Sequence, residues 1–215
     1  MTASGVSAGP GRDCPLCPRL AAFRGEQRAA NPGWFNAPVP SFGDREARLL
    51  IVGLAPGLKG ANRTGRPFTG DFAGVLLYAT LRKFGFARGE YGERADDGLT
   101  LVDCRITNAV RCVPPQNKPE PAEIKSCGGF LASEISSMPN LMAILALGQI
   151  AHNAALTALG QRKSSFPFRH GAVHAPADAP LLADSYHCSR YNTNTGTLTG
   201  TMFESVFAEL KKRLA

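Results

Sequence analysis

Four cysteines stand at positions from which their thiolates could surround one metal centre. Cys14 and Cys17 form a C-x-x-C pair near the start of the chain, and Cys112 and Cys127 follow in its second half. Four thiolates are the ligand set of a 4Fe-4S cluster, and they equally complete a tetrahedral zinc site. Buried free thiols are the third interpretation, because Cys127 lies near the apolar face of a predicted helix. The spacing alone leaves iron–sulfur and zinc open.

Three polar loops carry the other residues that could do chemistry. They run over residues 53–71, 108–118 and 185–199, and each follows a predicted strand. The first loop has neither G-x-G-x-x-G nor G-x-x-x-x-G-K-S/T, so the fingerprints of nucleotide cofactors are absent. The loops hold an acid, amides and a histidine, which are residue types that can activate water, read a base edge and stabilise an anion.

Apolar runs between the loops predict the elements that position them. Four short strands are expected at residues 49–52, 106–110, 141–147 and 181–183. Helices are expected over about residues 14–30, 72–84, 121–138, 149–159 and 202–214. Strands that are apolar without alternation, separated by helices, are typical of a parallel sheet covered on both faces. We predict an α/β fold, a three-layer α/β/α sandwich around a four-stranded parallel sheet, with the loops at the carboxyl ends of the strands.

The composition is that of one globular domain. The chain has 215 residues, of which 44 % are hydrophobic and 19 % are charged, so whole-chain disorder is excluded and a full core is possible. We expect a single domain over residues 14–215 that carries the metal centre, preceded by a flexible tail over residues 1–13.

Charge and apolar runs narrow the choice of partners and compartment. A net charge of +7 suits a polyanion such as nucleic acid or an anionic membrane, and it equally suits a merely basic soluble enzyme. The longest apolar run, residues 141–147, is much shorter than the ~20 residues that span a bilayer. The tail lacks the apolar run of a secretory signal, so we expect a cytoplasmic protein with no membrane partner and no disulfide framework.

Four motifs in order resemble the uracil-DNA glycosylase superfamily, and specifically its type 5 iron–sulfur members. They read GLAP at 53–56, NRTGRPFTGD at 62–71, NAVRCVPP at 108–115 and HCSRYNTNTG at 187–196. Each motif alone is weak, but the four together with four suitably placed cysteines are a strong signal over residues 14 to about 199. The family usually has proline where this chain has Cys188, and losing the fixed φ of proline is expected to loosen that turn.

The resemblance implies a metal centre at the four cysteines. It favours a 4Fe-4S cluster over zinc at Cys14, Cys17, Cys112 and Cys127. Breaking an N-glycosidic bond needs no electron transfer, so the cluster is expected to be structural and to tie the N-terminal helix to residues 108–127. The other two cysteines, Cys104 and Cys188, are expected to be ordinary thiols.

The resemblance also implies a pocket for a base rotated out of the DNA stack. Asn108 is the candidate reader, because an amide complements the O4 acceptor and the N3–H donor of uracil and rejects the reversed edge of cytosine. Phe68 would stack on the base, and Gly53 and Ala55 would line the pocket. The alternatives are a turn-forming cap for Asn108 and a core position for Phe68.

Bond cleavage develops positive charge on the sugar and negative charge on the departing base. Asp71 is the candidate for stabilising the cation or orienting water, with an N-cap of the next helix as its alternative role. His187 is the candidate for stabilising the leaving base, and Asn117 is a further polar candidate. Leu54 and Ala55, which follow the first strand, cannot act as a base.

Contacts with the DNA are expected from residues flanking these motifs. Arg63, Arg66 and Lys118 are candidate phosphate contacts, and either Arg190 or Tyr191 is the candidate wedge that fills the gap left by the base. The resulting prediction is a monomeric, monofunctional glycosylase that removes uracil and other deaminated bases from double-stranded DNA in base-excision repair. It would act at the nucleoid of a bacterial or archaeal cell. The alternatives are a non-catalytic iron–sulfur DNA-binding module and a redox sensor.

Overall fold

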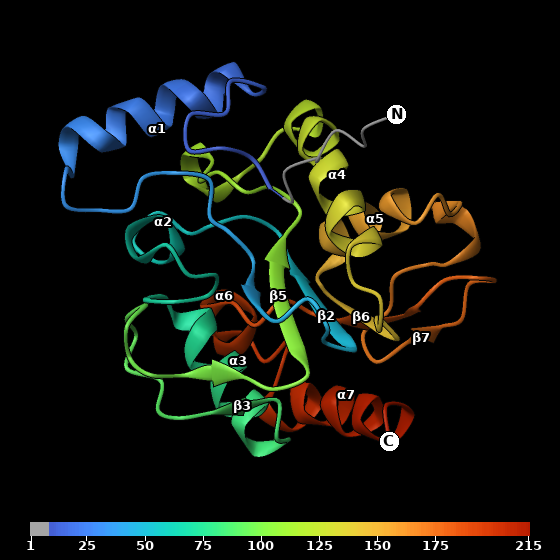
Figure 1. Ribbon diagram of the computed structural model, residues 1–215. Helices are drawn as coiled ribbons and strands as arrows, with labels where there is room; N and C mark the ends of the chain where they lie inside the picture. Colours follow the sequence, from blue (N-terminus) through green and yellow to red (C-terminus); the bar gives the residue numbers. More distant parts are fainter. Residues whose placement is uncertain (1–8) are drawn as a thin grey trace.

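Four parallel strands form the centre of a six-stranded sheet, and two short strands extend it at its edges. The computed structural model describes residues 9–215. The order across the sheet is β1-β5-β2-β6-β8-β7, in which only the edge strands β1 and β7 run antiparallel to their neighbours (Figure 1). The strands are β1 Phe42–Gly43, β2 Leu49–Gly53, β5 Cys104–Asn108, β6 Ala143–Leu147, β8 Leu181–Ser185 and β7 Val173–His174.

Helices cover both faces of this sheet. They are α1 Pro18–Ala30, α2 Ala61–Thr64, α3 Phe72–Lys83, α4 Pro121–Ser136, α5 Gln149–Ala158, α6 Arg190–Asn194 and α7 Gly200–Arg213. Alternate residues of β2 enter different cores: Leu49 and Ile51 pack with side chains of α3 and α7, whereas Leu50 and Val52 pack with side chains of α4 and α5. All five residues of β2 are buried. The predicted three-layer sandwich around four parallel strands is therefore confirmed.

Local signals explain where several helices begin. The side chain of Asp71 accepts a hydrogen bond from the Gly74 amide at the start of α3, and Thr199 caps α7 in the same way. Proline stands in the first turn of α1 and of α4, where its missing N–H costs nothing. A capping box between Glu120 and Glu123 further fixes the start of α4. Because proline favours the first turn of a helix, α1 begins at Pro18 and not at the predicted residue 14.

Other differences from the predicted elements lie in the strands and in the short helices α2 and α6, which were not predicted. β5 begins and ends two residues earlier than predicted, because the backbone beyond Asn108 turns to bond the loop after β2 instead. The two-residue strands β1 and β7, and a separate hairpin of β3 (Ala87–Arg88) and β4 (Thr100–Leu101), were not predicted. Strands of two residues leave no periodic pattern in a sequence.

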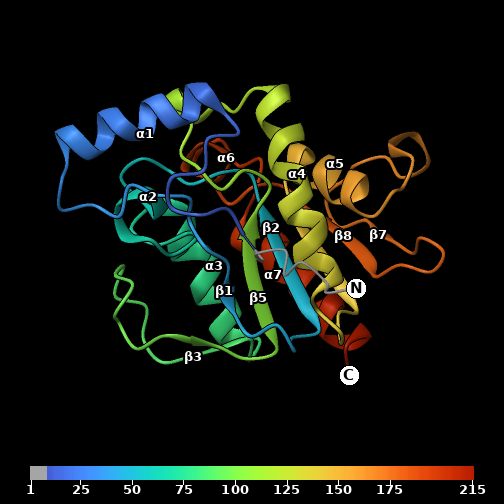
Figure 2. The same cartoon turned by 45° about the horizontal axis from the view of Figure 1, so that its top comes forward.

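The α1 helix lies at one end of the molecule, beside the first turns of α4 (Figure 2). Arg19 of α1 pairs with Glu123 of α4, and Leu20 packs with Cys112 and Cys127. Asp13 accepts a hydrogen bond from Arg28, so the chain just before α1 contacts the helix. The flexible tail stays a prediction, since residues 1–8 lie outside the described residues. Among the described residues, no helix combines the length and apolarity needed to cross a membrane.

Candidate active site and metal centre

The three polar loops meet at the carboxyl ends of β2, β5 and β8. Gly53 and Asn108, the last residues of β2 and β5, are paired neighbours in the sheet, and backbone bonds continue from the loop after β5 to Gly53 and Leu54. The loops enclose a cavity of about 270 Å³. It is lined by Leu54, Ala55, Pro56, Gly57, Ala61, Phe68, Asp71, Phe72, Ala73, Asn108, Asn117, His187, Ser189 and Arg190. Ligands of open α/β sheets bind at this edge of the strands.

Asn108 presents an unpaired polar atom to this cavity. Its side chain is only 3 % exposed, and its Oδ1 atom has no hydrogen-bond partner in the part of the chain that the structure describes. A buried polar atom without a partner costs about 1–3 kcal/mol, so such atoms are rare away from functional sites. The residue opposite must be glycine, because a Cβ on Gly53 would lie 2.4 Å from Asn108 Oδ1 and 2.5 Å from the ring of Phe68. Glycine at position 53 therefore leaves room for both the Asn108 amide and the Phe68 ring.

Phe68 forms one wall of the cavity in a strained backbone conformation. Its φ of 53° is in the left-handed region that non-glycine residues rarely occupy. Hydroxyl groups hold this turn: Tyr78 donates to the Pro67 carbonyl at 2.6 Å, and Tyr91 donates to the Phe68 carbonyl at 3.0 Å. The ring is 6 % exposed and also belongs to the core on the α3 side. Phe68 is therefore both a core residue and a residue of the cavity wall.

His187 lies on the other side of the cavity, just after β8. Its ring stacks on Phe68 at a centroid distance of 5.9 Å and an interplanar angle of 30°. Burial lowers the pKa of His187 to about 4, so the imidazole is neutral at neutral pH and can donate one hydrogen bond. Hydrogen bonds to the backbone hold this segment in place: the Ser185 carbonyl accepts from the Gly148 amide, and the His187 carbonyl accepts from the side-chain amide of Asn192.

Asp71 both caps α3 and faces the cavity. Its Oδ1 accepts from the Gly74 amide at 3.1 Å, while its Oδ2 lies against Gly57 and Gly60 of the first loop. A Cβ on Gly60 would come within 2.5 Å of that oxygen. Burial raises the pKa of Asp71 above its ordinary value. The capping and pocket interpretations of Asp71 are therefore compatible in one side chain.

Of the remaining predicted catalytic and DNA-contacting residues, Asn117 and Arg190 line the cavity, whereas Arg63, Lys118 and Tyr191 are outside its lining. Asn117 lies on the rim, is exposed and has a φ of 57°. Arg190 lies 5.1 Å over the ring of Phe72, the first residue of α3, which the sequence motifs did not single out. Tyr191, next on α6, is 75 % exposed. Arg63 and Lys118 are also exposed.

Arg66 corrects one prediction. Its side chain is only 4 % exposed, and both terminal nitrogens pair with Asp97 at 2.6 and 2.7 Å. The guanidinium also stands over the rings of Tyr78 and Tyr91. Arg66 is therefore a buried structural cation that holds the 66–69 turn, and it is withdrawn from the candidate phosphate contacts.

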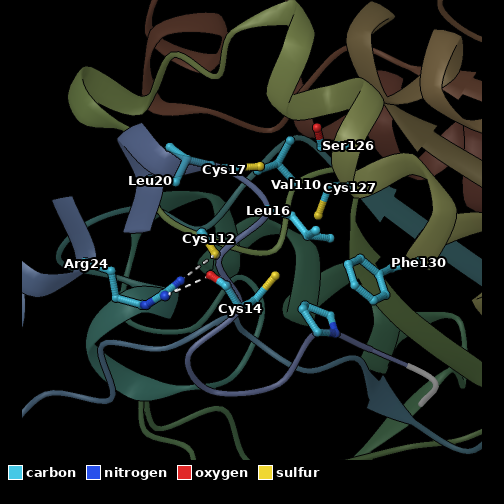
Figure 3. A pocket seen from close by; sticks show the side chains of 11 residues that line it. Cys14, Leu16, Cys17, Leu20, Arg24, Val110, Cys112, Ser126, Cys127 and Phe130 are labelled. Carbon is cyan, nitrogen blue, oxygen red and sulfur yellow. Dashed lines mark hydrogen bonds between the residues drawn. The ribbon is translucent and has the colours of Figure 1, made fainter. Parts of the chain in front are cut away.

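The four predicted cysteines surround a second, smaller cavity between α1, α4 and the loop after β5. Figure 3 shows their side chains turned toward this shared space, with apolar side chains around them. Hydrogen bonds reach three of these sulfurs: Arg24 donates to Cys112 Sγ at 3.4 Å, the backbone amide of Arg111 donates to Cys127 Sγ at 3.4 Å, and Ser126 bonds Cys17. By contrast, Cys104 and Cys188 are buried in the main core, as expected of ordinary thiols.

Comparisons with known proteins agree with this arrangement. A family model described as the uracil DNA glycosylase superfamily matches residues 40–211. A type-5 uracil-DNA glycosylase of Thermus thermophilus is 48 % identical over 206 residues, which cover 93 % of each chain. Type-5 uracil-DNA glycosylases of Mycobacterium tuberculosis and Pyrobaculum aerophilum are 42 % and 38 % identical, over 93 % and 94 % of this chain and 77 % and 88 % of theirs. The chain therefore belongs to the uracil DNA glycosylase superfamily, as the four motifs predicted.

Proposed function

We propose that this chain is a monofunctional DNA glycosylase that hydrolyses the N-glycosidic bond of uracil in double-stranded DNA. Its type-5 relatives carry the name uracil-DNA glycosylase, which supports a hydrolase of base-excision repair. The observation that carries the proposal is the buried, unpaired Oδ1 of Asn108 at the end of a cavity wide enough for a base.

Recognition of the base rests on Asn108 and Phe68. The free Oδ1 accepts the N3–H of uracil, and the Nδ2 of the same amide donates to O4. Cytosine offers a bare N3 acceptor and an amino donor, so both contacts become mismatched. Such a bidentate pair is worth about 1–3 kcal/mol of discrimination. Phe68 stacks on the base, while Gly53 and Ala55 leave room for it.

Cleavage is assigned to Asp71, His187 and Asn117. The Asp71 carboxylate stabilises the positive charge that develops on the sugar, or holds the attacking water. The neutral His187 donates a hydrogen bond to O2 of the base as its negative charge develops. Asn117 on the rim orients the nucleotide or the water. No lysine lines the described cavity, which favours hydrolysis by water over an amine nucleophile.

Tyr191, Arg63 and Lys118 are assigned to the DNA. Tyr191 is the wedge, because its ring is exposed and free of ring partners in the described structure, whereas the Arg190 guanidinium rests on Phe72. Arg63 and Lys118 contact phosphates, in line with the net charge of +7. A wedge that enters the stack implies a duplex substrate. We extend the proposal to other deaminated bases, a monomeric enzyme and the cytoplasm of a bacterial or archaeal cell.

The cofactor in this proposal is a structural 4Fe-4S cluster held by Cys14, Cys17, Cys112 and Cys127. Zinc bonded to sulfur at about 2.3 Å brings its ligands to about 3.8 Å from one another. The four cysteines line one cavity together with apolar side chains, and the resemblance to type-5 glycosylases favours a cluster over zinc there. The cluster would join α1 to α4 and to the loop that begins at Asn108.

The test is base release from a defined duplex. Purified protein is incubated with a duplex holding one uracil and with matched duplexes holding cytosine, hypoxanthine or xanthine, then heated in alkali to cut abasic sites. The proposal expects scission at uracil and none at cytosine, and scission lost in Asn108→Ala with iron content unchanged. Uracil-duplex binding without scission, at enzyme excess, would instead identify a non-catalytic binding module.

A further inference from the structure

Three arginines on α1 differ in what neutralises them. Arg19 pairs with Glu123 at 2.8 Å, and Arg28 pairs with Asp13 at 2.5 Å. Arg24 lies between them and is 4 % exposed, yet it forms no ion pair within 4.0 Å of a carboxylate among the described residues. The pKa of Asp13 is lowered mainly by its hydrogen bond to Arg28, and the charge of Arg24 adds to that effect from farther away. Its nitrogens instead bond Cys112 Sγ at 3.4 Å and the Cys14 carbonyl at 3.0 Å (Figure 3).

A guanidinium stays charged at any pH that a protein tolerates, and a buried charge needs a counter-charge. Neutral thiols supply none, and the Cys14 carbonyl offers only a dipole. Four thiolates on a cluster core form an anionic group, whose charge would lie directly beside Arg24. The buried arginine is therefore explained if the cavity is built to hold an anionic thiolate centre.

We propose that Arg24 is the counter-charge of the cysteine site and sets both how firmly the cluster is held and the potential at which it takes up an electron. The inference rests on the proposed iron–sulfur cofactor and adds a role to a residue that ligates nothing. Hydrogen bonds to sulfur and nearby charge are two of the factors that set cluster potentials. A cation at Arg24 favours the more negative, reduced state.

The geometry also explains why arginine rather than lysine stands here. One planar guanidinium reaches Cys112 and Cys14, which belong to segments almost a hundred residues apart, with two different nitrogens. Arg111 adds only its backbone amide to the sulfurs, since its own guanidinium pairs with Glu134 at 2.8 Å. Arg24 is thus the one side chain of the described residues that brings a hydrogen bond and an unspent positive charge to the site.

The experiment compares Arg24→Gln and Arg24→Lys with wild type, all purified without oxygen. Arg28→Gln is the matched control, because it removes a cation from the same helix at a residue that already has a carboxylate partner. Iron per protein is measured first, then the rate of iron release to a chelator, and then the reduction potential by dye-mediated titration followed by electron paramagnetic resonance.

Arg24→Gln is expected to lose iron at least about tenfold faster, as outer partners of metal ligands do, and to be reduced at a more negative potential. Arg24→Lys keeps the positive charge but not both hydrogen bonds, so its reduction potential should fall between those of wild type and Arg24→Gln. It replaces Arg24→Gln in the comparison if that variant does not fold. Arg28→Gln matches wild type.

Two outcomes overturn separate parts of this account. If cluster-loaded Arg24 variants had the wild-type reduction potential, Arg24 would only hold the Cys14 backbone in place. That outcome would reject the role proposed for Arg24 but not the cofactor. Wild-type protein that holds zinc or no metal would reject the cofactor, whereas base release in the duplex assay would still stand.

Discussion

The cavity at the ends of β2, β5 and β8 keeps a buried amide oxygen unpaired, whereas at the cysteine site hydrogen-bond donors already reach the sulfurs. Asn108 Oδ1 has no partner among the described residues, and His187 offers a neutral imidazole with a stacking contact. Around the cysteines, Arg24 and the amide of Arg111 both donate to sulfur. The cavity therefore has an acceptor free for a ligand, whereas the donors at the cysteine site are already bonded to sulfur.

This difference fits two kinds of ligand. A substrate that binds and dissociates needs protein hydrogen-bonding groups that are unpaired in the free enzyme. The unpaired amide, the strained backbone of Phe68 and the glycine at position 53 each cost the fold some stability. A resident cofactor is part of the folded state, so its binding free energy adds to the free energy of folding. Substitutions should therefore affect activity at the first site and folding at the second.

The largest effect is expected from removing one cysteine ligand. Cys112→Ser should yield protein without iron and mostly insoluble, because the proposed centre between α1 and α4 would be lost. Iron per protein and soluble yield are the measurements. Cys104→Ser is the control, since Cys104 is also buried but lies in the main core. Soluble, active Cys112→Ser without metal would end the structural role of the centre.

Asp71→Asn should have the second-largest effect. It removes the negative charge and keeps a side-chain oxygen that can cap α3. A general base contributes about 10²–10⁴-fold, so single-turnover uracil release should fall by that order with little change in melting temperature. The carboxylate is the active form and its pKa is raised, so wild-type activity should be lost as pH falls through that pKa. The variant should lack this acid limb. A variant with the wild-type rate would leave Asp71 only its capping role.

His187→Ala should slow base release by about 10²–10³-fold, the loss typical of one donor to a developing anion. His187→Gln keeps an N–H donor and should recover part of that loss, which a merely structural histidine would not allow. The pKa of about 4 makes the imidazole neutral throughout pH 5–8, so His187 should add no limb to the profile there. Equal rates in the alanine and glutamine variants would argue against the donor role.

Much of this fold can be predicted from the sequence, because buried parallel strands are continuous apolar runs. β2 (Leu49–Gly53) extends one residue beyond the predicted 49–52, and β6 (Ala143–Leu147) lies within the predicted 141–147. The motif residues also come together as predicted, since the ends of parallel strands share one edge. The edge strands and the β3–β4 hairpin could not be predicted, because two-residue strands depend on neighbours that only the fold supplies.

Buried charge is where sequence reasoning was weakest. Arg66 has the type and motif position of a phosphate contact, but its partner Asp97 is 31 residues away, and no local pattern joins them. Arg24 looks like any surface arginine of a helix, and only the packing of α1 on the cysteines buries it. In both cases a bonding partner is distant in sequence. The residue type therefore predicted a positive charge, but not that the charge would be buried or what it would contact.

The smallest effect is expected at Tyr191, which the fold does not need because it is 75 % exposed. Tyr191→Ala should slow uracil release from duplex DNA by about tenfold, since stacking against a base is worth about 1–3 kcal/mol. Release from single-stranded DNA should hardly change, because no gap in a stack has to be filled there. Tyr191→Phe keeps the ring and is the control.

The salt dependence separates this wedge from the phosphate contacts. Tyr191 is uncharged, so Tyr191→Ala should leave the slope of log affinity against log salt concentration unchanged. Arg63→Gln or Lys118→Gln should each reduce that slope by about 0.9, because each removes one phosphate contact. Equal slowing of Tyr191→Ala on duplex and single strands would mean that the ring contacts the flipped nucleotide itself, and the wedge would then have to be sought at Arg190.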